Sequence, residues 1–226
     1  MDAVSPRIDL WLMPLNGDAV DHHGRWLGCL DDAERVAHDR HAKDQDRILY
    51  AASHALTRYA LSQSFDADPS HWRFAEGPHG KPRIADPGPA IDPRFNLSHT
   101  PGLVAVAITD GLELGLDVEA LDPVSADLDT AHAFAHPAEL RHLDPEAPDF
   151  LAAFYKLWTR KEALAKATGL GLSLEVRQLI FEDEIVDHWH LIEFDEGTAH
   201  RVALLAELNK GRPEFVMHRI VPEEMI

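Results

Sequence analysis

The sequence is poor in cysteine and has no long apolar run. Its 226 residues include one cysteine, Cys29, so no disulfide can form within the chain, and zinc or iron-sulfur sites built from several cysteines are excluded. No stretch of about 18 or more apolar residues occurs. The segment 1–12 also lacks a basic region followed by an apolar one. We therefore expect no membrane span, no secretory signal and a cytoplasmic protein.

Positive charge is also scarce. Lys and Arg together number 21 against 39 Asp and Glu, which gives a formal net charge of −18. Double-stranded nucleic acid requires a basic face that neutralises phosphates, so this composition argues against such a partner. From Arg35 to Arg94, however, nine basic residues accompany eight acidic ones. A small polyanionic ligand would find its cations in this stretch; an ordinary mixed helix surface is the alternative.

The first third of the chain carries strand, helix and loop signals in turn. A strand is expected near Ile8. Asp31 and Glu34 have the spacing of a capping box, and apolar residues at helical spacing continue to about Ser64, which predicts one or two helices. The Pro/Gly-rich stretch 77–89 predicts a loop.

Strand signals return after residue 100. Residues 103–108 predict a strand, 109–111 a hairpin turn, and 112–119 a second strand with leucines on one face and acidic residues on the other. The remaining chain predicts two helices followed by the strands of a second sheet: helices 128–142 and 149–169, strands 176–181, 189–194, 201–208 and 215–221. We expect an α+β fold with two similar α/β halves, residues 1–122 and 123–226.

Two carboxylates stand out on the predicted strand 112–119. Asp117 and Glu119 are two residues apart, so their side chains point to the same side of the strand. Like charges this close raise each other's pKa unless a cation neutralises them, and Mg²⁺ prefers such oxygen ligands. The alternative is a solvent-exposed polar face on an edge strand.

A second group lies on the predicted helix 149–169. Glu162 and Lys166 are four residues apart, and Trp158 lies one turn earlier on the same stripe. Alone, the charged pair would be read as a surface salt bridge. A tryptophan on the charged stripe indicates that the stripe is partly buried in a cleft.

Phosphate-binding groups are also present. The segment 96–100 follows a proline-rich loop and precedes a strand, a setting in which Ser98, His99 and backbone N–H groups can converge on a phosphate. Lys81 lies between Gly80 and Pro82 on a stiffened loop. Each of these signals is weak in isolation.

Taken in order and spacing, these motifs resemble the 4′-phosphopantetheinyl transferases of the long, single-chain, surfactin-synthetase-activating type. The resemblance runs from about residue 80 to 173 and rests on the following segments: 80–82, 95–99, 115–119, 134–139 and 158–166. It implies a pseudo-twofold fold with the active site between two similar halves. It also implies transfer of the phosphopantetheine arm of coenzyme A to a serine of an apo carrier protein, with Mg²⁺ required and 3′,5′-ADP released.

The resemblance also implies a role for each candidate residue. Asp117, Glu119 and Glu162 would hold Mg²⁺. Glu162 would take the serine proton, and Lys166 would stabilise the departing phosphate. Lys81, Ser98 and His99 would hold coenzyme A phosphates. The candidates for binding its 3′-phosphate are Arg40, Lys43 and Arg47. Because both halves are in one chain, we expect a monomer.

Two other functions fit parts of the sequence. His132 and His136 are four residues apart, with His142 beyond, a spacing found in metal hydrolases. A non-enzymatic module that binds coenzyme A or docks a carrier, having lost turnover, would carry the same motifs as the transferase.

Overall fold

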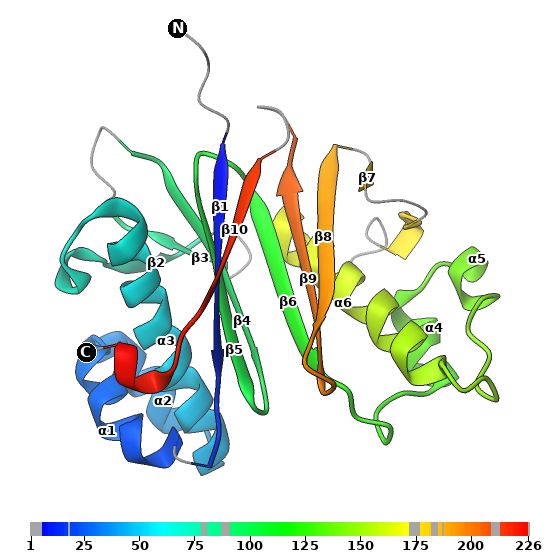
Figure 1. Ribbon diagram of the computed structural model, residues 1–226, viewed down its shortest axis with the longest axis horizontal. Helices are drawn as coiled ribbons and strands as arrows, with labels where there is room; N and C mark the ends of the chain where they lie inside the picture. The colour runs from blue at the N-terminus through cyan, green and yellow to red at the C-terminus, as the bar shows by residue number, and fades with distance from the viewer. Residues whose placement is uncertain are drawn as a thin grey trace, which may run out of the picture. The chain divides into compact units, whose positions relative to one another are not determined.

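The computed structural model describes residues 6–17, 19–77, 81–86, 91–171, 177–181, 185–186, 188–208 and 213–225. The chain divides into two units by its internal contacts. We call them the β1 unit (Arg7–Glu76, Pro82–Gly111 and Glu214–Ile226) and the β6 unit (Met1–Pro6, Gly77–Lys81 and Leu112–Pro213). The mixed α+β character predicted from the sequence is confirmed in both (Figure 1).

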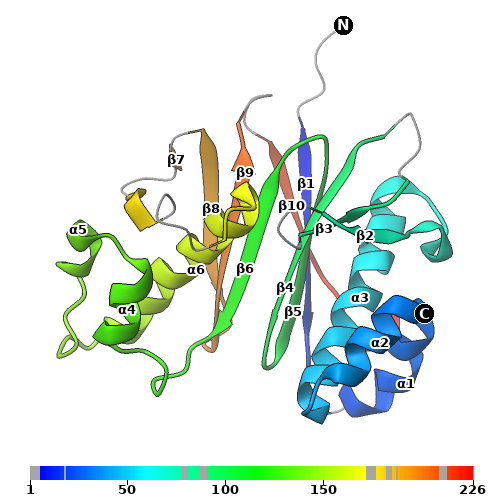
Figure 2. The ribbon, with the colours of Figure 1, turned by 180° about the vertical axis from the view of Figure 1, so that it is seen from behind.

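The β1 unit is a four-stranded sheet with helices on one face (Figures 1 and 2). Its strand order is β10-β1-β5-β4, in which β1 runs parallel to β10 and antiparallel to β5. The strands are β1 (Arg7–Pro14), β4 (Pro93–Thr100), β5 (Leu103–Asp110) and β10 (Glu214–Arg219). The helices are α1 (Ala19–Cys29), α2 (Asp32–Arg40) and α3 (Asp44–Phe65). The buried helix α3 packs its apolar residues on β5, forming the core of this unit.

Local signals explain several of these elements. The strand near Ile8 is confirmed as β1, and the helices predicted up to Ser64 are α2 and α3. Asp31 and Glu34 form the predicted capping box at the start of α2. Helix α1 was not predicted from the sequence. The stretch 77–89 is not wholly loop, because β3 (Pro82–Ile84) pairs with β2 (Phe74–Glu76). Short 3₁₀ turns complete the unit: η1 (Pro69–His71) and η3 (Pro222–Glu224).

The β6 unit is a second four-stranded sheet, of order β6-β9-β8-β7. Its strands are β6 (Leu114–Ala120), β7 (Ile185–Val186), β8 (Trp189–Glu196) and β9 (His200–Glu207). Helix α6 (Phe150–Thr168) covers one face (Figure 2). The predicted bounds of this helix are confirmed, since Asp149 precedes it and Gly169 ends it in the left-handed conformation, φ 69°.

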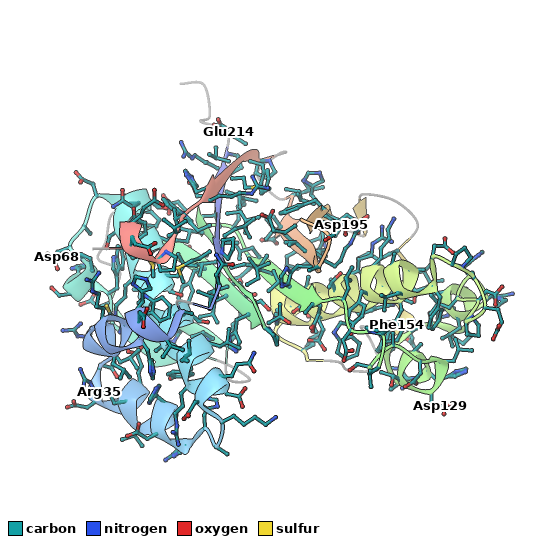
Figure 3. All side chains as sticks on the ribbon, turned by 60° about the horizontal axis from the view of Figure 1, so that its bottom comes forward. Arg35, Asp68, Asp129, Phe154, Asp195 and Glu214 are labelled. Atoms are coloured by element: carbon teal, nitrogen blue, oxygen red, sulfur yellow. The ribbon has the colours of Figure 1, made fainter. Side chains whose placement is uncertain are left out.

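Two short helices extend the β6 unit beyond the sheet: α4 (Leu128–Phe134) and α5 (Pro137–Leu140). Helix α4 packs on α6, with the Phe134 and Phe154 ring centroids 5.7 Å apart; Phe154 is labelled in Figure 3. The single helix predicted over 128–142 is wrong, because proline at 137 lacks the N–H that a continuous helix would need and restricts the residue before it.

Three strand predictions also need correction. The hairpin at 109–111 is wrong, since β5 pairs with β1 and β4 whereas β6 pairs with β9. Residues 177–181 form no strand, and Val176 lies outside the described residues. The last strand, β10, joins β1 and not the second sheet. Within the described part of the chain, no helix is long and apolar enough to cross a membrane.

Candidate active site

A glycine brings helix α6 directly against strand β6. A Cβ atom added to Gly115 would lie 2.0 Å from the carbonyl oxygen of Ala163 and 2.3 Å from the backbone nitrogen of Ala167. Only glycine permits this approach. Asp117 and Glu119 follow on the same face of the strand and therefore also face α6. Asp117 is 3% exposed, so a solvent-exposed polar face is the wrong interpretation of this pair.

Helix α6 presents Trp158, Glu162 and Lys166 to this face, one turn apart from each other. Lys166 Nζ lies 2.7 Å from Asp117 Oδ1. Trp158 Nε1 donates a hydrogen bond of 2.9 Å to Glu119 Oε1. The predicted partial burial of this stripe is confirmed. We call Asp117, Glu119, Glu162 and Lys166 the carboxylate cluster.

The carboxylate cluster is short of positive charge. Burial raises the pKa of Glu119 to about 7; the charges of Asp117 and Glu162 add to this, while Trp158 and Lys166 oppose it. Burial and the charge of Asp117 also raise the pKa of Glu162. Among the described residues, Lys166 is the cation that lowers both pKa values, and these three carboxylates are a donor set that a hard divalent cation would stabilise.

This chemistry fits Mg²⁺, although the ligand geometry is not assembled. Among the residues that the structure describes, no group of three or more His, Cys, Asp or Glu side chains is arranged to hold a metal ion. Joint ligation of Mg²⁺ by Asp117, Glu119 and Glu162 therefore stays a prediction.

A second charged cluster lies on the same face of the sheet and was missed by the sequence analysis. Glu193 on β8 pairs with Arg160 at 2.6 Å, Arg201 at 2.8 Å and Lys156 at 3.5 Å. Burial alone would raise the pKa of Glu193, but hydrogen bonds and charge from Arg160 and Arg201 lower it to about 2. We call this the Glu193 cluster. The sequence indicates this cluster through the acidic residues at alternate positions of β8, Glu193 and Asp195.

Lys81 belongs to the same unit as the carboxylate cluster. Its Nζ lies 3.2 Å from Glu113 Oε2 and donates a hydrogen bond of 3.0 Å to the Leu114 carbonyl oxygen. Leu114 is three residues before Asp117, which at about 3.3 Å per residue places Lys81 beside the strand roughly 10 Å from the carboxylate cluster. Gly80, the first residue of its motif, lies outside the described residues.

Ser98 and His99 lie in the β1 unit, within β4. The segment that follows the proline-rich stretch is itself a strand, because the β4–β5 ladder includes both residues. His99 Nδ1 lies 3.1 Å from Ser53 Oγ of α3, whereas Ser98 is buried. Successive side chains on a strand alternate between its faces, so the sheet does not bring these two side chains together.

The candidate ligands of the 3′-phosphate gather where α2 ends and α3 begins, also in the β1 unit. Arg40 is the last residue of α2 and Lys43 directly precedes α3. Both are exposed. Arg47, in the first turn of α3, pairs with Asp44 at 3.0 Å. The structure thus gathers three basic residues within one short stretch.

The histidine pattern does not form the arrangement that a hydrolase would need. His132 lies on α4, but His136 is the residue that caps α5, with Nδ1 accepting from the Ala138 N–H at 3.1 Å. The two imidazoles therefore do not share a helix, and the premise of this alternative is wrong.

Comparison with known proteins gives a consistent result. A family model described as the 4′-phosphopantetheinyl transferase superfamily matches residues 113–215. The protein slr0495 of Synechocystis sp. is 28% identical over 187 residues, 82% of this chain and 74% of slr0495. The 4′-phosphopantetheinyl transferase ffp of Bacillus subtilis is 33% identical over 166 residues, 71% of this chain and 68% of ffp.

Another relative, the 4′-phosphopantetheinyl transferase Sfp of Bacillus subtilis, is 34% identical over 138 residues, 59% of this chain and 57% of Sfp. The family model covers β6 and α6, the two elements that build the carboxylate cluster. The chain therefore belongs to the 4′-phosphopantetheinyl transferase superfamily and is an enzyme of this class.

Proposed function

We propose that this enzyme transfers the 4′-phosphopantetheine group of coenzyme A to a serine hydroxyl of an apo acyl or peptidyl carrier protein, with Mg²⁺ required and 3′,5′-ADP released. The observation that supports this most is the carboxylate cluster, because one buried and two partly buried carboxylates beside Lys166 suit a cation bound to a diphosphate. The Bacillus subtilis relatives named above are transferases of this group.

In the proposed reaction, the serine oxygen forms a bond to the phosphorus that bears the pantetheine arm. The bond from this phosphorus to the bridging oxygen breaks, and that oxygen leaves with 3′,5′-ADP. Asp117, Glu119 and Glu162 would hold Mg²⁺, which when bound orients the diphosphate and offsets its charge.

The protein's own groups supply the remaining steps. Glu162 takes the serine proton, a role suited to a carboxylate whose pKa is raised by burial. Lys166 donates a hydrogen bond to the departing phosphate and stabilises its charge. Trp158 orients Glu119 through its indole N–H.

The residues that would bind coenzyme A are the candidates named from the sequence. Lys81, Ser98 and His99 would hold the diphosphate. The 3′-phosphate would be bound by the basic residues at the α2–α3 junction: Arg40, Lys43 and Arg47. The pseudo-twofold relation of the halves 1–122 and 123–226 is part of the same proposal.

Intact-mass spectrometry tests the proposed function. Several apo carrier proteins are incubated with the enzyme, coenzyme A and Mg²⁺, beside an EDTA control and an Asp117→Asn variant. We expect a mass gain of one phosphopantetheine on at least one carrier, absent in both controls. Calorimetric binding of coenzyme A with no mass gain on any carrier would contradict transfer and support the non-enzymatic module.

A further inference from the structure

Lys161 is a motif residue that the proposed reaction leaves without a task. It directly precedes Glu162 on α6, yet its side chain is fully buried, with 0% of its surface exposed. A buried lysine is expensive unless it is paired and hydrogen-bonded. Its partners therefore indicate what it does.

The partner of Lys161 is Glu139, in the segment 134–139 that also lacked a task. Lys161 Nζ lies 2.9 Å from Glu139 Oε2 and donates a hydrogen bond to the carbonyl oxygen of Leu179. The ammonium also lies 5.5 Å from the ring centroid of Phe181. The buried lysine thus contacts two segments far apart in the sequence.

Glu139 is itself held from two further directions. Its Oε2 accepts a hydrogen bond of 2.8 Å from the His136 N–H, and its Oε1 accepts one of 3.2 Å from the Phe181 N–H. The carboxylate therefore joins the start of α5, the segment 177–181 and α6. Such a junction fixes the direction in which Lys161 leaves the helix.

Successive residues of an α-helix point about 100° apart, so the direction of Lys161 determines that of Glu162. Side-chain atoms lie about 5–6 Å from the helix axis, and a rotation of about 20° would move the Glu162 carboxylate by about 2 Å. A displacement of about 1 Å can cost about 100-fold in rate. The contact at Gly115 sets how close α6 lies to β6. Trp158, Arg160 and Lys161 each make a contact that limits rotation of α6 about its own axis, and the ion pair of Lys161 is the most deeply buried of these contacts.

We propose that Lys161 and Glu139 are positioning residues, whose buried ion pair fixes the rotation of α6 and thereby aims Glu162 at the carboxylates of β6. The proposal rests on the proposed function for the role of Glu162. Neither residue touches substrate; both act through the helix.

The test compares three variants. Lys161→Met with Glu139→Gln replaces the ion pair without leaving a buried charge, which is often neutral for stability. Glu139→Asp alone is milder, because it keeps the counter-charge of Lys161 and only withdraws the carboxylate by one methylene group. Lys156→Met is the matched control, the same substitution on the same helix at a half-exposed lysine of the Glu193 cluster.

For the double variant, corrected for the folded fraction by circular dichroism, we expect kcat to fall about 10- to 100-fold. The KM for coenzyme A should change less than about twofold, and Mn²⁺ affinity measured by electron paramagnetic resonance should fall about tenfold. Glu139→Asp should show the same pattern more weakly, and Lys156→Met should match the wild type.

The proposal would be overturned if the folded double variant had the kcat and the Mn²⁺ affinity of the wild type. It would also be overturned if the loss of activity were fully explained by the smaller fraction of folded protein. If the double variant does not fold, Glu139→Asp decides by the same criteria. A wild-type enzyme that transfers nothing would refute the proposed function, and the Mn²⁺ titration would still decide the positioning role.

Discussion

Asp117 and Glu193 lie in the same row of one sheet and have opposite surroundings. Both are cross-strand partners of Ala203, Asp117 on β6 and Glu193 on β8. Strands are about 4.8 Å apart, so the two Cα atoms are separated by about 10 Å. Yet three cations surround Glu193, whereas among the described residues Asp117 lies with Glu119, Glu162 and the cation Lys166.

This difference distinguishes a structural cluster from a functional one. The pKa of Glu193 is lowered to about 2, since its charge is fully compensated by Arg160 and Arg201 despite burial. The pKa of Glu119 is raised to about 7, since burial and its neighbours oppose its charge. Active sites are where such uncompensated groups are found.

Removing a carboxylate from the carboxylate cluster should abolish transfer and leave the fold intact. For Asp117→Asn and for Glu162→Gln we expect the transfer rate to fall at least about 100-fold, because each would remove a ligand of the cation and Glu162 also takes the proton. The measurement is the rate of carrier mass gain, with thermal unfolding as the control for folding. Either variant turning over at the wild-type rate would contradict the mechanism.

Adding one methyl group at Gly115 should separate the elements that build the cluster. Gly115→Ala would place a Cβ within 2.3 Å of two backbone atoms of α6. Backbone atoms of a helix cannot move aside as the end of a flexible side chain can. We expect a loss of about 1–3 kcal/mol in stability and about 100-fold in kcat. Urea unfolding and steady-state kinetics measure the two effects.

The matched control is Gly28→Ala on α1, where an added Cβ meets nothing within 4 Å. That substitution should be neutral or stabilise the protein by about 0.5–1 kcal/mol, because alanine favours the helix. Equal behaviour of the two variants would show that the approach of α6 to β6 is not constrained at Gly115.

Lys166→Ala should impair chemistry more than binding. Without its ammonium the departing phosphate loses a hydrogen-bond donor, and we expect kcat to fall about 10- to 100-fold with a smaller rise in the Kd for coenzyme A. Single-turnover kinetics and calorimetry measure the two quantities. A large loss of affinity with unchanged kcat would mean that Lys166 binds the substrate and does not assist the reaction.

Glu193→Gln should affect stability and not turnover. The substitution leaves Arg160, Arg201 and Lys156 without their shared partner, and we expect a loss of about 1–3 kcal/mol in stability with kcat per folded molecule retained.

A second consequence concerns the dependence of stability on pH. Because the folded pKa of Glu193 is about 2 and its ordinary value is 4.5, its stabilisation is complete above pH 4.5 and is lost as pH falls toward 2.

Urea unfolding at several pH values checks this prediction. The wild type should lose stability between pH 4.5 and 2 more steeply than Glu193→Gln does. Identical slopes would mean that the Glu193 cluster is not the source of this pH dependence.

Much of the site could be predicted because its signals are local. The four-residue spacing of Trp158, Glu162 and Lys166 sets one helical stripe, and the alternation of Asp117 and Glu119 sets one strand face. Both follow from the backbone period alone. The bounds of α6 likewise follow from Asp149 and Gly169, its flanking residues.

What depended on distant contacts could not be predicted. The turn residues 109–111 do follow β5, but β6, the strand after them, pairs with β9, about 90 residues later in the sequence. From the sequence, Gly115 is only a residue that disfavours a strand. Its role in the close approach of α6 is seen only in the structure. The cations of Glu193 come from α6 and β9, and no sequence period connects them. The strand that contains Ser98 and His99 was not predicted, although the strand after it was.

A Mn²⁺ titration followed by electron paramagnetic resonance tests the central claim most directly, since it compares the two clusters without requiring a carrier protein. The account predicts that the wild type and Glu193→Gln bind Mn²⁺ with the same affinity, whereas folded Asp117→Asn binds it at least about tenfold more weakly. Equal affinity in all three proteins, or a loss confined to Glu193→Gln, would contradict the assignment of the carboxylate cluster as the reaction site.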